Sequence, residues 1–293
     1  MIVLIRALWE YYVSSFFIRK VKQRRWFRGL AKEQIDVILG RWPRVEQRTD
    51  PTSLLKFFRK IAPVETEHPL VRIGGPSDGG YLVPADLEGI EYCFSPGVGT
   101  RSDFELELAE RKIRCFLADY SVEAPPKSSS YFTFDKKFLG ASNSETHMTL
   151  QSWVEKHLPS TDRDAILQMD IEGDEYAVLE SVSPALLGRF RILVIEFHRW
   201  QKMIDRNFFA RCSTIFEHLH EQFEVLHIHP NNGNKVIYYR GIPIPRTLEF
   251  TFLRKDRISK RLPATHFPHP LDAANVPSRP PIHLPRCWYK PVL

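Results

Sequence analysis

The sequence predicts an α/β protein with a mostly parallel β-sheet and helices on both faces of that sheet. Two observations indicate this class. Between residues 70 and 255, short apolar runs alternate with segments whose apolar residues recur at helical spacing, which is typical of parallel strands connected by helices. Several apolar runs also end in glycine, acidic or histidine residues, and open α/β sheets bind ligands beyond the carboxyl ends of their strands.

Residues 1–69 are predicted to form a basic helical arm or cap. Apolar residues recur at helical spacing over residues 32–42 and 51–62. Asp50 followed by Pro51 is typical of a helix N-cap with proline at the first helical position.

The first 18 residues, MIVLIRALWEYYVSSFFI, are apolar and aromatic, and the basic run RKVKQRR follows them. A secretory signal is disfavoured because the positive charge follows the apolar run instead of preceding it. A membrane-spanning helix is marginal in length and carries two charges. An interfacial helix with a basic flank and a helix packed on the body both remain open.

Residues 70–255 are predicted to form the α/β domain. Its strands are expected over residues 91–99, 113–120, 131–140, 165–171, 191–198, 224–230 and 248–255, and its helices over residues 102–112, 148–158, 174–182 and 208–223. Residues 256–293 form the third segment, a proline-rich extension: eight of the 22 prolines fall in the last 33 residues. Since proline fixes φ and lacks a backbone donor, an extended chain is expected there and not a packed helix.

Length and composition fit this organisation. A chain of 293 residues with 43% hydrophobic residues suits one large α/β domain with extensions and can bury a sizeable core. The four cysteines form no CxxC pair and no metal-binding spacing. They are therefore interpreted as reduced thiols, which predicts a cytoplasmic protein.

The net charge of +6 is unevenly distributed. Residues 1–60 carry 14 Lys and Arg against 5 Asp and Glu, so the remaining residues are mildly acidic. This pattern argues against a nucleic-acid groove on the body of the protein. It allows the basic arm to contact an anionic membrane surface as a peripheral partner.

A glycine turn follows the first predicted strand of the sheet. The strand ends in Gly97 and Gly99, a helix follows, and the next strand ends at Asp119. Glycines allow a sharp turn and close approach of a ligand, and an acid after the second strand can bind ribose hydroxyls. A nicotinamide or flavin cofactor is disfavoured because Ser102 stands where the third fingerprint glycine belongs. S-adenosylmethionine, which has no pyrophosphate, fits this pattern, although an ordinary structural turn would also explain it.

Two further stretches gather polar groups near the strand ends. In GGPSDGGYLVP, two glycine pairs flank Pro76, Ser77 and Asp78, so the loop can offer backbone donors to a ligand. In LQMDIEGDEYAVLESV, four carboxylates lie within six residues after a buried strand. Like charges this close repel one another, so a cation, a proton-transfer task or capping of the following helix is the expected compensation. Five predicted strands end in glycine or polar residues that could together line the rim of one pocket. In chain order, these residues are Gly97 and Gly99, Asp119, Asp170 and Glu172, Glu196 and His198, and His229, Asn231 and Asn232.

The chain resembles the FkbM-type family of S-adenosylmethionine-dependent methyltransferases, and within it a branch with a DGGY loop before the first strand. The resemblance rests on RIGGPSDGGYLV, FSPGVGTRSDFELELA, LQMDIEGDEYAVLESV, LVIEFH and HIHPNN…LEFTFLRK, which follow one another over roughly residues 70–255. It implies the Rossmann-like class I methyltransferase fold, with seven strands of which the last is antiparallel. Ser95 and Pro96 depart from the pattern, since methyltransferases usually carry an acid at the position of Ser95.

The resemblance also implies roles for individual residues. Gly97 and Gly99 line the methionine part of the cofactor, and Asp119 holds its ribose. Phe104 and Glu105 support the glycine loop. The residues expected to close over the cofactor or substrate, or to face the sulfonium and the acceptor, are Asp78, Gly79, Gly80, Asp170 and Glu172.

The main hypothesis is a methyltransferase that uses S-adenosylmethionine to methylate a hydroxyl of a sugar, a glycan or another small molecule. The candidate residues for taking up the acceptor's proton are Asp170, Glu196, His198 and His229. Asp170 and Glu196 could instead hold Mg²⁺ through oxygen ligands, an alternative that the residues allow but do not favour, and no dedicated metal site is predicted.

Two other classes of protein remain open. Ser95 and Pro96 give weight to a non-catalytic binding or scaffold protein that keeps the fold, which would bind the cofactor weakly or not at all. A glycosyltransferase is disfavoured because the acids of DIEGDE open a helix instead of lying on a loose loop. The methyl acceptor and the oligomeric state are not indicated by the residues.

Overall fold

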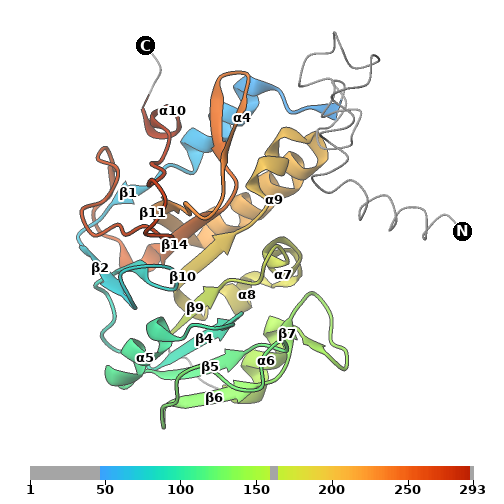
Figure 1. Ribbon diagram of the computed structural model, residues 1–293, viewed down its shortest axis with the longest axis vertical. Helices are drawn as coiled ribbons and strands as arrows, with labels where there is room; N and C mark the ends of the chain where they lie inside the picture. Colours follow the sequence, from blue (N-terminus) through green and yellow to red (C-terminus); the bar gives the residue numbers. More distant parts are fainter. Residues whose placement is uncertain (1–46, 159–163, 291–293) are drawn as a thin grey trace, which may run out of the picture. The chain divides into compact units, whose positions relative to one another are not determined.

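The computed structural model describes residues 47–158 and 164–290 (Figure 1). The chain divides into two compact units, Met1–Arg48 and Thr49–Leu293. The second unit contains every element described below. The expected helix over residues 32–42 and the apolar N-terminal segment lie outside the described residues.

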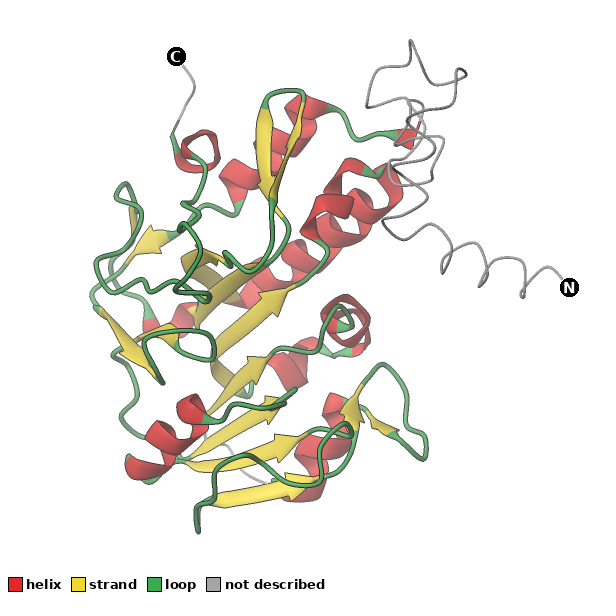
Figure 2. Ribbon diagram, in the orientation of Figure 1, coloured by secondary structure: helices red, strands yellow, loops and turns green. Residues whose placement is uncertain are grey.

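A seven-stranded sheet forms the centre of the second unit (Figure 2). Its strand order is β6-β5-β4-β9-β10-β14-β11, and β14 runs antiparallel to both of its neighbours, β10 and β11. The strands are β4 (Tyr92–Pro96), β5 (Arg114–Ala118), β6 (Phe132–Asp135), β9 (Ala165–Met169), β10 (Phe190–Phe197), β11 (Phe223–Pro230) and β14 (Leu248–Arg254). This is the expected sheet, including its antiparallel last strand.

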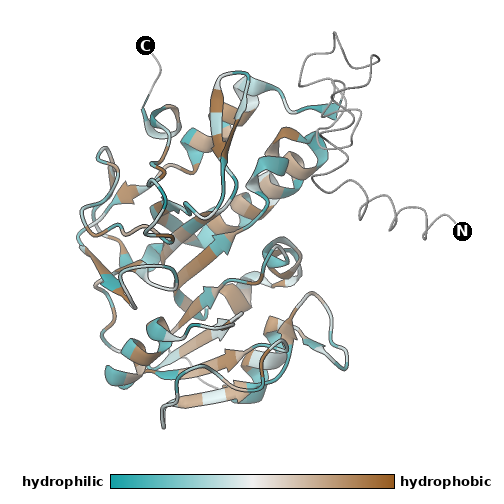
Figure 3. Ribbon diagram, viewed as in Figure 1, coloured by the Kyte–Doolittle hydropathy of each residue, from teal (hydrophilic) through white to brown (hydrophobic). Residues whose placement is uncertain are grey.

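Helices cover both faces of the sheet, as expected. Figure 1 shows α6, α7 and α9 along one face, and α5 on the other. Their bounds are α5 (Asp103–Glu110), α6 (Leu150–His157), α7 (Glu175–Ser181), α8 (Pro184–Leu187) and α9 (Arg206–Gln222). The central strands are predominantly hydrophobic in Figure 3, and β9 and β10 are buried at every position, because helices or loops cover them on both sides.

A two-stranded hairpin joins α5 on its face of the sheet. β2 (Leu70–Ile73) pairs antiparallel with β3 (Tyr81–Pro84), and the glycine-rich loop connects them. Arg72 fixes the shape of this loop by donating from Nε to the carbonyl of Gly75 at 2.9 Å and from Nη2 to the carbonyl of Ser77 at 3.0 Å. The hydroxyl of Thr251 on β14 donates to the carbonyl of Leu82 at 2.6 Å, which ties the hairpin to the sheet.

The face of the sheet opposite α5 and the β2–β3 hairpin carries an aromatic core. Helix α4 (Pro51–Lys60) begins as expected, with the Asp50 side chain accepting from the backbone N–H of Ser53 at 2.8 Å and with Pro51 at its first position. α4 contributes two rings to a cluster with α9, β10, β14 and a short 3₁₀ helix, η3 (Trp200–Ile204). The cluster consists of Phe57, Phe58, Phe197, Trp200, Phe216 and Phe250.

The segment after β14 lies along the same unit. Residues Leu262–Pro263 form β15, which pairs with β1 (Val64–Glu65), and most of the following chain has no regular structure. The expectation of a tail without a packed helix is wrong at α10 (Arg286–Tyr289), where Trp288 is 1% exposed. Pro285 precedes the first turn of α10, where a missing backbone N–H costs nothing, and burial of the large indole stabilises the turn.

Smaller paired strands complete the unit. They are β7 (Phe138–Leu139) with β8 (His147–Met148) and β12 (Val236–Tyr239) with β13 (Ile242–Pro245), and a 3₁₀ turn, η4 (Lys255–Arg257), follows β14. Among the described residues, no helix has the length and apolarity needed to cross a membrane.

Candidate functional site

The glycine turn after β4 brings the ends of β4 and β9 together. Gly97 has φ +88° and donates its N–H to the carbonyl of Ala118 on β5 at 2.8 Å. A Cβ at Gly97 would lie 1.6 Å from the backbone oxygen of Asp170, the residue after β9. Only glycine therefore fits here, both for its backbone conformation and for the close approach of the two strand ends.

A cavity of about 180 Å³ opens at this point between the glycine turn, the hairpin loop and the end of β9. It is lined by Asp78, Gly79, Tyr81, Gly97, Val98, Gly99, Thr100, Arg101, Phe104, Glu105, Gln168, Asp170 and Glu172. Six of the eight residues predicted to bind the cofactor are in this lining. The structure thus brings three separate sequence motifs to one cavity.

The other two predicted residues hold the turn and the loop. Asp119 accepts from the N–H of Gly99 at 2.9 Å through one oxygen and from the N–H and hydroxyl of Ser121 at 2.7 and 2.6 Å through the other. It therefore stabilises the glycine turn. Gly80 packs against the hairpin loop, since a Cβ there would lie 2.1 Å from the carbonyl oxygen of Gly75.

A chain of buried polar groups lies behind the cavity. The hydroxyl of Ser95 contacts the carboxyl of Glu105 and, at 2.6 Å, the amide oxygen of Gln168, whose NH₂ donates to the Tyr81 hydroxyl at 3.2 Å. Burial raises the pKa of Glu105 from 4.5 to about 7. One hydroxyl has only one proton to donate, so a protonated Glu105 can donate to Ser95 while Ser95 donates to Gln168. Glu105 thus places a carboxyl directly beside Ser95.

His198 lies at the centre of the acidic cluster that follows β9. Its Nδ1 is 2.9 Å from Glu175, and its Nε2 is 3.5 Å from Glu172, 3.8 Å from Asp170 and 4.0 Å from Glu196. Burial by itself lowers the pKa of His198, but the hydrogen bond to Glu175 and the charges of the surrounding carboxylates raise it above its usual value. Protonation of His198 would offset part of the charge of the crowded acids.

The four carboxylates of LQMDIEGDEYAVLESV divide between two roles. Glu175 is fully buried and accepts from the backbone N–H groups of Ile171 and Gly173 at 3.3 and 3.0 Å, so it closes the turn before α7. Asp174 is the N-cap residue of α7, but its side chain makes no capping hydrogen bond. Asp170 and Glu172, in contrast, face the cavity.

Asp170 is the least satisfied of these acids. Its Oδ1 is buried and has no hydrogen-bond partner among the described residues. Burial, followed by the charge of Glu196, raises the pKa of Asp170 well above its usual value. Burial and the neighbouring charge of Glu249 raise the pKa of Glu196 in the same direction, and Asn231 donates to Glu196 at 2.8 Å.

Two residues that sequence reasoning did not identify complete this side of the site. Glu249 lies on β14 opposite His229, and Asn275 comes from the segment after β14. The NH₂ of Asn275 donates to Asp78 at 3.1 Å and to Glu249 at 2.5 Å, and its amide oxygen lies 3.2 Å from Nε2 of His229. An acid inside an apolar strand is the only sequence signal for Glu249, and Asn275 has none.

Of the four predicted catalytic residues, Asp170, Glu196 and His198 lie close together, and His229 lies apart from them. Asp170, Glu196 and His198 place one potential ligand atom each within 4.8 Å of the others, and so do Asp78, Glu196 and Glu249. Either set offers the oxygen ligands that Mg²⁺ prefers. His229 belongs to neither set, because its ring contacts Asp272 and Asn275.

Residues 101–232, from the turn before α5 to the end of β11, match the family model described as "Methyltransferase FkbM domain". No curated protein matches the chain.

Proposed function

We propose that the chain is a methyltransferase of the FkbM family, whose model matches residues 101–232, and that it transfers a methyl group from S-adenosylmethionine to a hydroxyl of a sugar, a glycan or another small molecule. The observation that carries the proposal is the contact between Gly97 and the backbone of Asp170. It places the glycine turn suited to the cofactor directly against an acid suited to accept a proton.

The residues of the cavity fit this cofactor. The cofactor carries a positive sulfonium whose methyl group is the electrophile. The lining supplies Asp78, Glu105, Asp170 and Glu172 as acids, together with the glycines Gly79, Gly97 and Gly99. The buried Oδ1 of Asp170 has no hydrogen-bond partner among the described residues, and a cationic or hydrogen-donating ligand would compensate for this.

Asp170 is the best candidate for the general base. It faces the cavity, and burial followed by the charge of Glu196 raises its pKa well above the usual value, which makes it a stronger base than an exposed carboxylate. His198 suits the role less well, because its raised pKa and its hydrogen bond to Glu175 favour the protonated imidazolium. We assign His198 the role of positioning Asp170 and balancing its charge.

Glu196 and His229 lie further from the acceptor side in this assignment. Glu196 accepts from Asn231 and lies behind Asp170, and His229 is oriented by Asp272 and Asn275. If Mg²⁺ takes part, Asp170 and Glu196 supply its oxygen ligands.

The proposal is tested by isothermal titration of the full chain with S-adenosylhomocysteine. Micromolar binding is expected, and Asp119→Asn should weaken it by roughly tenfold or more, because the variant loses both the anchor of Gly99 and an acceptor for a ribose hydroxyl, each worth about 1 kcal/mol or more. Asp256→Asn is the matched control, since Asp256 is 58% exposed and pairs with Arg254 on the strand after the site.

The titration distinguishes the methyltransferase proposal from the scaffold alternative. A folded chain that does not bind S-adenosylhomocysteine, with or without Mg²⁺, would overturn the methyltransferase proposal and favour the scaffold alternative. If binding occurs, Asp170→Asn should leave the affinity within a few-fold of the parent. The variant should also lower methyl transfer to any acceptor found by screening by about 100-fold or more.

A further inference from the structure

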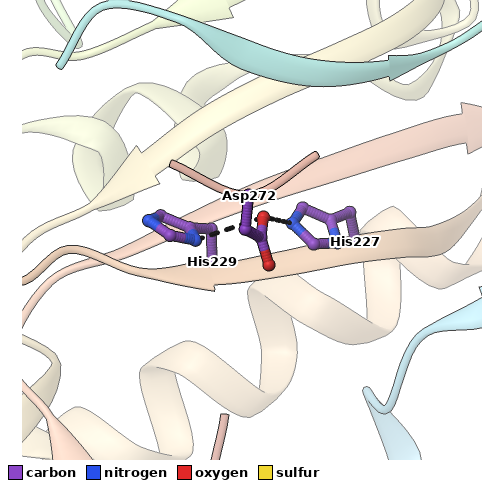
Figure 4. Close-up of side chains that lie close together, drawn as sticks. All are labelled: His227, His229 and Asp272. Atoms are coloured by element: carbon purple, nitrogen blue, oxygen red, sulfur yellow. Dashed lines mark hydrogen bonds and ion pairs between the residues drawn. The ribbon is translucent and has the colours of Figure 1, made fainter. Parts of the chain in front are cut away.

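Two histidines and an aspartate meet at the edge of the sheet, outside the proposed methyl-transfer cavity. His227 and His229 lie two residues apart on β11, so their side chains project from the same face of the strand. Asp272, from the segment after β14, lies between the two rings (Figure 4). Its Oδ1 is 2.8 Å from Nε2 of His227 and 3.3 Å from Nδ1 of His229.

The neighbouring hydrogen bonds fix which nitrogen of His229 is free to bind a ligand. Asn275 directs its NH₂ at two carboxylates, Asp78 and Glu249, so its amide oxygen must face Nε2 of His229. Nε2 must then carry a hydrogen and donate it. In the neutral ring the lone pair lies on Nδ1, directed at the Asp272 oxygen, so these two atoms require either a second proton on the ring or a metal ion between them. An outer partner that holds one ring nitrogen as a donor is the usual support of a metal-binding histidine.

The spacing of the three atoms suits a single ion. Metal–ligand distances of about 2.0–2.2 Å at roughly tetrahedral or octahedral angles place ligand atoms about 3.0–3.4 Å apart. The two measured distances, 2.8 and 3.3 Å, are close to this range, and all three atoms lie within 4.8 Å of one another. Two histidines and one carboxylate are a set that leaves further coordination positions open.

A cavity next to the cluster provides access for an ion and for water. It has a volume of about 290 Å³, and its lining includes His227, His68, His266 and His269. His269 is not a suitable fourth ligand as it stands, because its Nδ1 accepts from the N–H of Leu271 at 3.2 Å, which leaves the hydrogen on Nε2. Water would therefore complete the coordination.

We propose that His227, His229 and Asp272 bind a divalent transition-metal ion, with zinc as the representative. Imidazole ligands favour zinc and its neighbours over Mg²⁺ or Ca²⁺, which prefer oxygen. The ion would connect β11 to the segment that carries Asn275 three residues later, and Asn275 in turn contacts Asp78 at the methyl-transfer cavity. The site is thus structural, and it supports one wall of the proposed active site.

The test is a zinc titration of the full chain after dialysis against a chelator, followed by calorimetry and by the melting temperature. One zinc ion per chain should bind with micromolar or higher affinity and raise the melting temperature. Asp272→Asn and His227→Gln should each weaken binding by about 100-fold or more, since even a partner outside the first coordination sphere is worth about 10–100-fold. His266→Gln is the matched control, because His266 lines the same cavity, is exposed and is not a proposed ligand. It should bind zinc like the parent.

The carboxylate sets of the active site are the competing location for zinc. Glu196 belongs to both of them, so Glu196→Gln should leave zinc affinity within twofold of the parent if the proposal is correct, and Mg²⁺ in excess should not displace the ion. The proposal is overturned if the folded chain takes up no zinc at millimolar concentration. It is equally overturned if Asp272→Asn binds zinc as tightly as the parent, or if Glu196→Gln alone abolishes binding.

Discussion

Glu105 shows how one buried group sets a property of the whole site. Its carboxyl is 4% exposed and contacts Ser95, behind the cavity. In the folded state its pKa is raised to about 7, so the folded chain holds this proton more tightly than the unfolded chain does. The resulting contribution to stability is largest below the unfolded pKa of 4.5 and is lost as the pH rises toward 7.

Glu105→Gln should therefore flatten the pH dependence of stability. Between pH 5 and 7.5, the free energy of unfolding of the parent should fall by roughly 2 kcal/mol more than that of the variant. Urea unfolding at the two pH values measures this difference. The contributions of the other buried acids to the pH dependence cancel in the comparison, because both proteins contain these acids. Equal losses in the two proteins would show that Glu105 is already ionised at pH 5.

Residues near the ends of the strands could be predicted from the sequence, and residues that reach the site from far along the chain could not. Asp170 and Glu172 follow an apolar strand, and Gly97 follows another, so the rule that parallel strands end at one edge of the sheet places them together. Asn275 has no such pattern. It lies in an irregular, proline-rich segment, and its position depends on contacts with residues more than 25 positions away.

At the scale of secondary-structure elements, α10 stabilises the region that carries the C-terminal side of the site. The indole of Trp288 stacks on Phe58 of α4 with ring centroids 3.8 Å apart, and its Nε1 donates to the carbonyl of Pro243 at 3.2 Å. α4, β13 and the chain after β14 are thereby connected through one side chain.

Trp288→Ala should lower the free energy of unfolding by about 3–5 kcal/mol, because it leaves a cavity between α4 and β13. Trp288→Phe should recover a large part of this loss by keeping the ring stack. Chemical denaturation measures both effects, and S-adenosylhomocysteine affinity below the transition should be the same for both variants and the parent. A loss of less than 1 kcal/mol in Trp288→Ala would contradict a packed α10.

The type and order of the elements could be predicted better than their pairing. Periodicity alone places the seven strands of the central sheet and helices α5, α6, α7 and α9, whereas the shorter elements α8, β8, β12 and β13 were not predicted. No local sequence pattern predicts that β14 lies between β10 and β11. This position depends on which strand edges are still unpaired when β14 joins the sheet. The resemblance to a known family supplied the antiparallel direction of β14.

At the scale of the whole molecule, the uneven charge distribution is the property that local contacts do not explain. Five basic residues lie between positions 19 and 25, directly after the apolar N-terminal run, whereas the rest of the chain beyond residue 60 is mildly acidic. We propose that this arm contacts anionic lipid, with the basic residues near the headgroups.

The full chain should sediment with vesicles that contain phosphatidylserine and not with neutral vesicles at physiological salt. Replacing Arg19, Lys20, Lys22, Arg24 and Arg25 with Gln should weaken binding by at least about tenfold, since each basic residue near such a surface is worth about 1 kcal/mol. A variant with five Lys or Arg residues replaced beyond position 250 controls for net charge. Equal binding of the parent to neutral and anionic vesicles would contradict the electrostatic part of the proposal.

The position of Asn275 and Asp272 in the sequence has a consequence for biosynthesis. A ribosome completes all seven strands of the sheet before either residue leaves the exit tunnel. Until then Glu249 lacks the amide that donates a hydrogen bond to it, and His229 lacks the carboxylate of Asp272 beside it. A chain that stops after β14 would contain all seven strands but would lack Asn275, Asp272 and Trp288, so one wall of the proposed site and the packing of α10 would both be missing.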